Sequence, residues 1–310
     1  MIEVFSKDGL EQIVKSNDFI ELTILPKLGG KMISLKDKVT GTEFLLPNQH
    51  PSRKYFIPKY GDDFSLFDCS GWDECFPNIS QEEMFSNNNK IILPDHGELW
   101  NREWKYFIDN NDLILRIDSI ALNYELEKKI TLRNNEVSIF YKLTNLSKDK
   151  FDYIWATHPL LNVEPGDKIL FSDEIKELSL YWSSDEKDNK DDKINLPIHK
   201  SIDFSVVQNC NFKKALKLYS KKLTVGSIGL VKQKQRSSLT LEFDVEKFPF
   251  LGIWLCYCGW PTDREEKHFT IALEPTTSNT DSLSEAIRNQ SAKTINPKEI
   301  IKWEIIIKII

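Results

Sequence analysis

Apolar and polar residues alternate along the middle of the chain with a period of two, which is the pattern of strands that bury one face. The stretch 124–133, "YELEKKITLR", places on one side its apolar residues Tyr124, Leu126, Ile130 and Leu132. The stretch 136–144, "EVSIFYKLT", repeats the pattern after the turn residues Asn134 and Asn135. We therefore predict two neighbouring antiparallel strands here.

Further strand-like runs recur at a spacing of roughly ten residues. They are "FIELTIL" (19–25), "LILRIDSI" (113–120), "YIWAT" (153–157), "LTVGSIGLV" (223–231), "SLTLEF" (238–243), "FTIALE" (269–274) and "IIKWEIIIKII" (300–310). Helical patterns are few: a short amphipathic segment around Leu10–Val14, and "DSLSEAIRNQ", where Asp281 or Ser282 would be the N-cap.

Strands and helices do not alternate, so a parallel α/β sheet is disfavoured. The charged stretch 182–197 reads as a loop between strands rather than a linker, because strands resume beyond it. We predict one all-β domain, residues 1–310, built as a large antiparallel β-sandwich of two packed sheets with few short helices.

Composition narrows the range of partners. The chain has 310 residues, of which 40% are hydrophobic, and a formal net charge of -6, so it can bury a large core but offers little attraction to nucleic acid. The start, "MIEVFSKDGL", lacks the pattern of a secretory signal, and no apolar run approaches the ~18 residues that span a membrane. We expect a cytoplasmic protein that binds a small molecule or another protein, with a homodimer as an open alternative.

The five cysteines form neither a CxxC pair nor a dense framework, so we expect reduced thiols without a metal or redox role. Cys256 and Cys258 stand two apart in "FLGIWLCYC". In a strand they would share a face and behave as small buried hydrophobic residues.

Three protonatable residues stand out as candidates for catalysis. His96 in "LPDHGELW" lies on a glycine-containing bend, and either Asp95 or Glu98 would orient it. His158 and Glu274 each follow an apolar strand-like run, and each is followed by a proline that we expect to end the strand. Such partly desolvated groups suit proton transfer, although a core histidine or a salt-bridged strand end has the same signature.

The remaining histidines, His50, His199 and His268, lie among polar neighbours, and we expect them to be exposed.

Four motifs, in this order, resemble those of the aldose 1-epimerase (galactose mutarotase-like) family: "PKLGGKMISLKDKVTGTEFL", "LPDHGELW", "THPLL" with "EPGDKI", and "ALEPTT". The resemblance covers roughly residues 20–285. It implies a large β-supersandwich and interconversion of the α and β anomers of a hexose without a cofactor. It further implies that His158 is a general acid, Glu274 a general base and His96 an assisting residue.

A sugar ring also needs a flat apolar surface surrounded by polar groups. "GWDECFPNIS" offers Trp72 and Asp73, and "GIWLCYCGW" offers Trp254, with Tyr257 and Trp260 nearby. Asp73 and Trp254 are our preferred binders, although most tryptophans of so large a sandwich must lie in the core. Arg102 in "WNREW" is a further substrate contact or, alternatively, part of an exposed salt bridge.

The chain also departs from the family pattern. "HPLLNV" replaces an aromatic segment, and "NFKKALKLYSKKL" holds no counterpart of a substrate-contacting aspartate, so galactose specificity does not transfer.

Three other functions stay open. A hexose-6-phosphate epimerase would use Arg53, Lys54 and Lys59 as a phosphate pocket. A glycosidase would use Glu274 with Asp73 as its two carboxylates. A non-catalytic carbohydrate-binding or sensor protein would retain the sugar-binding cleft without catalysing a reaction.

Overall fold

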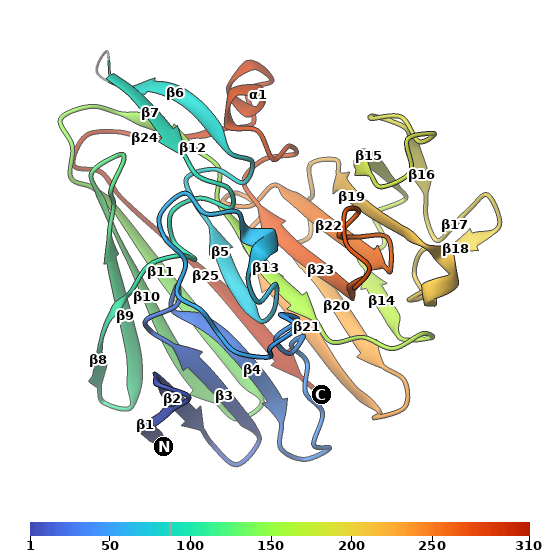
Figure 1. Ribbon diagram of the computed structural model, residues 1–310, viewed down its shortest axis with the longest axis horizontal. Helices are drawn as coiled ribbons and strands as arrows, with labels where there is room; N and C mark the ends of the chain where they lie inside the picture. The colour runs from blue at the N-terminus through green and yellow to red at the C-terminus, as the bar shows by residue number, and fades with distance from the viewer. Residues whose placement is uncertain (87–88) are drawn as a thin grey trace.

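The computed structural model describes residues 1–86 and 89–310 and consists mainly of two large sheets that face each other (Figure 1). Every pairing between the strands named below is antiparallel, from β1 with β2 to β21 with β25. The predicted all-β sandwich is confirmed.

The larger sheet has eleven strands, in the spatial order β1 (Ile2–Lys7), β2 (Leu10–Ser16), β3 (Ile20–Leu25), β4 (Lys31–Asp37), β5 (Trp72–Cys75), β13 (Ala156–Leu161), β23 (Phe269–Thr276), β22 (Phe250–Tyr257), β19 (Lys214–Ser220), β15 (Glu177–Ser183) and β16 (Lys193–Asn195). The second sheet has eight strands, in the order β14 (Lys168–Phe171), β20 (Ser227–Lys232), β21 (Ser237–Phe243), β25 (Ile300–Ile309), β11 (Glu136–Asn145), β10 (Tyr124–Arg133), β9 (Asp112–Asp118) and β8 (Lys105–Asp109).

Smaller elements surround the two sheets. Three two-stranded pairs are β6 (Glu82–Ser86) with β7 (Asn89–Leu93), β12 (Phe151–Tyr153) with β24 (Lys293–Ile295), and β17 (Ile198–His199) with β18 (Ile202–Asp203). The helical elements are the 3-10 turns η1 (Phe64–Leu66) and η2 (Cys210–Phe212) and the helix α1 (Leu283–Arg288). Ser282 caps α1 by accepting the backbone N–H of Glu285, as predicted.

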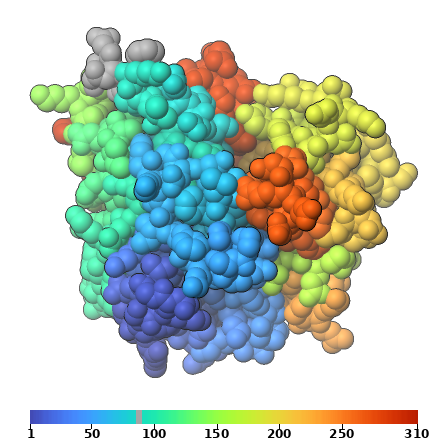
Figure 2. Space-filling model, in the orientation of Figure 1, coloured from blue at the N-terminus to red at the C-terminus, as the bar shows by residue number. Residues whose placement is uncertain are grey.

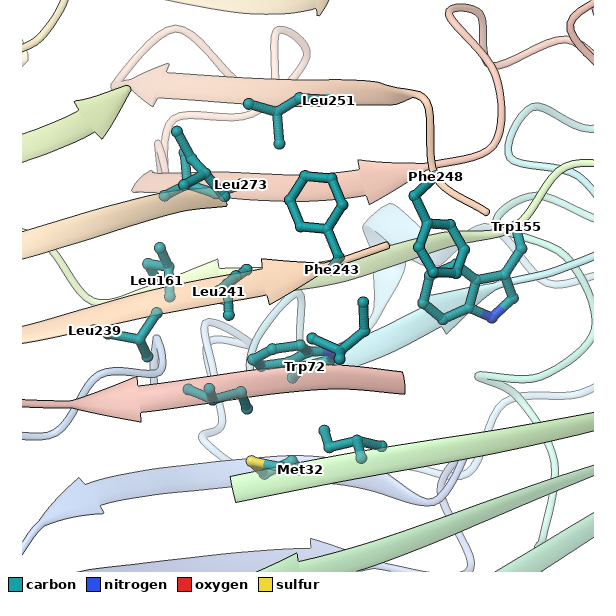
Figure 3. Close-up of a cluster of buried hydrophobic side chains, with 14 of the residues drawn as sticks. Met32, Trp72, Trp155, Leu161, Leu239, Leu241, Phe243, Phe248, Leu251 and Leu273 are labelled. Carbon is teal, nitrogen blue, oxygen red and sulfur yellow. The ribbon is translucent and has the colours of Figure 1, made fainter. Parts of the chain in front are cut away.

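The core lies between the two sheets and follows the period-two pattern. In β10 and β11 the predicted apolar positions are buried except Leu132, which is half-buried, and Leu126 stands directly opposite Leu143. Figure 3 shows side chains of both sheets, such as Leu273 and Leu241, meeting in this layer. The core between the sheets also contains a buried ion pair, in which Lys128 Nζ on the inner face of β10 lies 2.9 Å from the Glu74 carboxylate.

Two local predictions are wrong. The segment around Leu10–Val14 is strand β2 rather than a helix, because residues 10–15 pair with β1 and residues 13–16 also pair with β3. These ladders outweigh a short helical period. The predicted loop 182–197 is shorter than expected, since β15 continues to Ser183 and β16 lies within it.

The cysteine prediction also needs correction. Cys258 lies just after β22 with φ 60° and forms a disulfide with Cys210 in η2. It therefore leaves the face of Cys256, which is a buried free thiol together with Cys69 and Cys75. The two bonded cysteines are 48 residues apart, and only the fold brings η2 to the end of β22. Among the described residues, no helix has the length and apolarity that crossing a membrane requires.

Candidate active site

A cavity of about 640 Å³ lies on the outer face of the eleven-stranded sheet, and this volume is typical of small-molecule sites. Strand alternation shows which face it is. In β13 the side chain of Leu161 packs in the core, whereas His158 and Leu160 line the cavity. In β23 the side chain of Leu273 packs in the core, whereas Glu274 lines the cavity.

Two distant segments meet above this face. In Figures 1 and 2 the blue segment that contains η1 and the orange segment near residue 260 lie side by side. The Arg264 guanidinium joins them, since it donates to the carbonyl and hydroxyl oxygens of Ser65 at 2.9 Å. Phe64 of η1 lines the cavity and is buried. The loops therefore form a wall over the sheet.

The three proposed catalytic side chains meet in this cavity. The Nε2 atom of His158 lies 3.9 Å from Oε1 of Glu274, and the rings of His96 and His158 are 5.2 Å apart between centroids. All three residues line the cavity wall. Residues separated by up to 178 positions in the sequence thus line one cavity.

Neither His158 nor Glu274 ends its strand, which corrects the expected effect of the following prolines. β13 continues to Leu161, with Pro159 opposite Trp72, and β23 continues to Thr276, with Pro275 opposite Leu251. Proline is tolerated at ladder positions where no N–H has to be donated. Both catalytic candidates are therefore held within a sheet rather than at its rim.

His96 lies on the predicted bend, in a left-handed conformation. Its φ is 58° and that of Gly97 is 74°. A Cβ atom at Gly97 would lie 2.2 Å from the carbonyl oxygen of Phe76, so the bend needs glycine. The imidazole stacks on Phe64 at 4.2 Å between centroids, and its Nδ1 lies 3.0 Å from the Asp95 carboxylate.

Asp95, rather than Glu98, is the carboxylate that orients His96. Glu98 is fully buried and accepts from the hydroxyl of Ser119 at 2.7 Å and from the backbone N–H groups of Ile120 and Ala121 at 3.1 and 3.2 Å. Its function is to tie the bend to a neighbouring loop.

The electrostatics of the site separate the two histidines. Enclosure of His96 disfavours its charged form, but the Asp95 carboxylate outweighs this effect and raises the pKa of His96. Burial lowers the pKa of His158 well below its ordinary value, and the charges of His96 and Lys217 lower it further. At neutral pH, His96 is therefore the better carrier of a proton, and His158 is neutral.

Glu274 is held by a lysine that the sequence reasoning did not single out. Burial raises the pKa of Glu274, and the contact with Lys217 opposes this shift. Oε2 of the carboxylate accepts from Lys217 Nζ, while Oε1 has no hydrogen-bond partner among the residues that the structure describes. Gly252 leaves room for this arrangement, because a Cβ atom there would lie 2.8 Å from Oε2.

Lys217 belongs to a buried polar group that extends to Asp281. Lys217 Nζ lies 3.8 Å from the Asp281 carboxylate, which also accepts from the hydroxyl of Tyr219. The signal in the sequence is a lysine in the apolar run "KALKLYS", because a charge inside a buried strand needs a partner.

No protein-family model and no curated protein sequence matches the chain. Solved structures do. A galactose mutarotase-like protein from Clostridium acetobutylicum superposes with a TM-score of 0.70 at 16% identity, covering 100% of this chain and 98% of that one. A galactose mutarotase-like protein from Lactobacillus casei superposes with a TM-score of 0.67 at 14% identity, and the match covers 96% of this chain and 100% of that one. A candidate aldose 1-epimerase of Escherichia coli superposes with a TM-score of 0.70 at 12% identity, and the match covers 100% of this chain and 99% of that one.

The chain has the galactose mutarotase-like fold. At identities of 12 to 16%, the likeness shows the fold and leaves the reaction to be argued from the site.

Within this mutarotase-like fold, the structure places Trp254 in the cavity wall but not Trp72. Trp72 is 1% exposed and points into the core between the sheets, beside Met32 (Figure 3). The reason is strand parity, since in β5 the side chains of Trp72 and Glu74 share the inner face. Tyr257 is likewise in the core.

Asp73 and Arg102 are also outside the cavity wall of the described chain. Asp73 is buried, and its carboxylate lies 3.0 Å from Lys31 Nζ, which also contacts Asp68 at 2.6 Å. Asp73 therefore belongs to a buried ion-pair cluster with Lys31 and Asp68 and does not reach the cavity. Arg102 is half-buried, and its carbonyl oxygen accepts from the N–H of Gly29.

His268 was expected to be exposed, and this is wrong. It is 9% exposed, lines the cavity, and lies edge-on to Trp260 at 4.9 Å between ring centroids. Burial, and then the charge of Arg264, lower the pKa of His268 to about 4. His50 and His199 are half-buried and do not line the cavity.

The charged residues of the cavity wall are mainly acidic. Among the described lining residues there is one lysine, Lys217, and no arginine, against four acidic residues, Asp63, Asp95, Glu274 and Asp281. The proposed phosphate ligands Arg53, Lys54 and Lys59 are not in this wall. In the described part of the chain, no three His, Cys, Asp or Glu side chains are grouped as metal ligands.

Proposed function

We propose that the protein is an aldose 1-epimerase that acts on neutral sugars. One observation carries the proposal: the Oε1 atom of Glu274, without a partner in the described structure, faces His158 at 3.9 Å in a cavity that also holds His96. Opening a pyranose ring needs a base at the anomeric hydroxyl and an acid at the ring oxygen, and this group of residues supplies both.

In the proposed reaction, Glu274 Oε1 takes the proton of the anomeric hydroxyl while His96 gives its proton to the ring oxygen. The bond between the anomeric carbon and the ring oxygen breaks, and a carbonyl group forms. Rotation about the adjacent carbon–carbon bond presents the other carbonyl face, and closure reverses both transfers. Each positioned transfer typically contributes about 10²–10⁴ in rate.

The acid in this scheme is His96, although the family resemblance implies His158. The pKa of His96 is raised because Asp95 outweighs the effect of enclosure, whereas burial holds the pKa of His158 well below neutrality. Neutral His158 can donate one hydrogen bond to a sugar oxygen and so position the anomeric centre.

Lys217 completes the base. A buried carboxylate without a partner would keep its proton at neutral pH, and a protonated Glu274 could not accept another. The contact with Lys217 favours the ionised form and fixes Oε2, which leaves Oε1 for the sugar.

The cavity wall favours uncharged substrates. Its four acidic residues repel phosphate, and its one lysine, among the described lining residues, is paired with Glu274. The glycosidase alternative relied on Asp73, which is held by Lys31 outside the cavity.

Magnetisation exchange between the α and β anomers, measured by NMR, tests the proposal. We expect the protein to accelerate exchange of glucose or galactose and not of glucose 6-phosphate. Glu274→Gln should lower the catalysed rate by about 10²–10⁴. Glu242→Gln, on the exposed side of the second sheet, is the matched control and should keep the wild-type rate. Binding of sugars without any catalysed exchange would favour the sensor function instead.

A further inference from the structure

Strand β1 is an open edge of the eleven-stranded sheet, because in the described structure it pairs on one side only, with β2. Its residues 3–7 are exposed, and Val4 and Phe5 are each 43% exposed. In Figure 2 the dark blue segment that contains β1 lies at the surface of the molecule. An exposed edge strand carries unpaired backbone groups and is a template for pairing with another strand.

We propose that two copies of the chain pair through their β1 strands, antiparallel about a two-fold axis at Phe5, and so join their large sheets into one. The partner is a second copy of this chain. The pairing does not depend on the proposed reaction. Strands β2, β3, β4 and β5 lie between β1 and β13, so this surface is separate from the cavity residues on β13 and β23.

The backbone of β1 offers hydrogen bonds in the alternation that this pairing needs. The Met1 nitrogen donates to the Ser16 carbonyl at 2.7 Å, and the Ser16 N–H donates to the Met1 carbonyl at 2.9 Å. Such pairs recur at every second residue of an antiparallel ladder, so residues 3, 5 and 7 also bond to β2. The N–H and C=O groups of residues 2, 4 and 6 therefore point outward. About an axis at Phe5, Val4 of each copy exchanges both bonds with Ser6 of the other.

The side chains of β1 select the same register. About this axis, Glu3 of each copy stands opposite Lys7 of the other. The two Phe5 residues form a non-hydrogen-bonded pair, in which Cβ atoms lie about 4.5–5.5 Å apart. A shift by two residues would separate the opposite charges, and a shift by one would place outward-bonding residues opposite inward-bonding ones.

Glu3 and Lys7 are also free to make this contact. Both are exposed, and neither takes part in an ion pair within the described chain. The two-fold axis uses each pair twice, so the dimer gains two attractions between opposite charges. This self-complementarity of charge is the reason to assign the surface to a second copy.

The edge strand β8 of the second sheet is the alternative surface. Pairing about Phe107 would place Lys105 opposite Asp109. However, Lys105 already lies 3.9 Å from Asp118, and the Arg116 guanidinium lies over the Phe107 ring, 4.7 Å from its centroid. The corresponding groups of β8 thus have partners within one copy, and β1 is the better surface.

Charge reversal tests the pairing, with the mass in solution measured by sedimentation velocity over a range of concentrations. We expect wild type to form a dimer. Glu3→Lys and Lys7→Glu each turn both attractions across the axis into repulsions. Each should raise the dissociation constant of the dimer by about tenfold or more at low salt. Lys150→Glu, the same charge change in an exposed loop, is the control and should leave the constant unchanged.

An equimolar mixture of Glu3→Lys and Lys7→Glu separates the pairing from a loss of folding. In a mixed dimer, the charges at positions 3 and 7 of one variant meet opposite charges of the other. The mixture should therefore dimerise about as tightly as wild type, and so should the double variant Glu3→Lys/Lys7→Glu.

Wild type that stays monomeric up to millimolar concentrations would overturn the proposal, and so would a mixture in which the two variants do not associate. A dimer that Lys105→Glu weakens and Glu3→Lys leaves unchanged would also overturn it, because β8 would then be the interface.

Discussion

At the scale of single residues, the contact between Lys217 and Glu274 determines the pH range in which we expect the site to be active. Lys217→Met would remove the cation that favours the Glu274 carboxylate, and the pKa of Glu274, already raised by burial, would rise further. We expect the acid side of the kcat/KM profile to move to higher pH and the rate at neutral pH to fall about tenfold. Anomer exchange measured across pH checks this.

Lys217→Arg is the matched control, since it keeps the charge and should keep the position of the acid side. A Lys217→Met variant that loses rate equally at every pH would show that Lys217 only supports the local structure.

Gly97 gives a second prediction at this scale. A Cβ atom there would lie 2.2 Å from the Phe76 carbonyl, at a φ of 74°. Gly97→Ala should therefore displace His96 and destabilise the protein by about 1–3 kcal/mol. Urea unfolding measures the stability. Gly41 has a similar φ of 76°, but a Cβ atom there would have no neighbour within 4 Å, so Gly41→Ala should lower the free energy of unfolding by less. Equal losses of stability in the two variants would contradict the steric argument.

The residues of the cavity wall were only partly predictable from the sequence. His96, His158 and Glu274 were found because they stand in recognisable motifs beside apolar runs. Lys217 and His268 were not, because their burial depends on strands that approach from elsewhere in the chain. Trp72 was misplaced because the parity of β5 relative to the core is set by its pairing with β13 rather than by its own sequence.

At the scale of elements, Lys31 of β4 binds β5 to the loop that holds Asp68. It contacts the carboxylates of Asp68 and Asp73, and all three groups are buried. Lys31→Met would leave two buried carboxylates without a cation and should cost about 3–5 kcal/mol of unfolding free energy. Asp73→Asn leaves the Lys31–Asp68 pair intact and should cost much less. Equal losses in urea unfolding would contradict this order.

The same cluster has a pH signature. Burial raises the pKa of Asp73 to about 7, although Lys31 opposes the shift. Because the folded-state pKa lies above the ordinary 3.8, ionising Asp73 destabilises the folded state. Wild type should therefore lose stability relative to Asp73→Asn as pH rises from about 4 to 7. Urea midpoints for the two proteins across this range give the comparison, and a constant difference would argue against the raised pKa.

Elements with a long alternating pattern were predicted well. The stretches 124–133 and 136–144 are β10 and β11, because each buries one face along most of its length. Short elements were not, since β2 is specified by its two neighbours and the disulfide between Cys210 and Cys258 by the position of η2.

At the scale of the whole molecule, the site results from strand order. β5, β13 and β23 are neighbours in the large sheet although they lie far apart along the chain, and this order brings His158 and Glu274 together. Period-two patterns specify which face each side chain takes but not which strands become neighbours. The resemblance of motifs predicted the meeting of these residues, and the local pattern alone could not.

The pH profile of anomer exchange tests the central claim most directly, namely that Glu274 and His96 pass protons to and from the sugar. Glu274 must be ionised, so the rate should rise as pH passes its pKa, which is raised above 4.5. His96 must be protonated, so the rate should fall as pH passes its pKa, which is raised above 6.5. We therefore expect a bell-shaped profile for wild type, and loss of the alkaline side in His96→Asn. A wild-type rate, corrected for the spontaneous reaction, that stays constant across both limits would contradict the account.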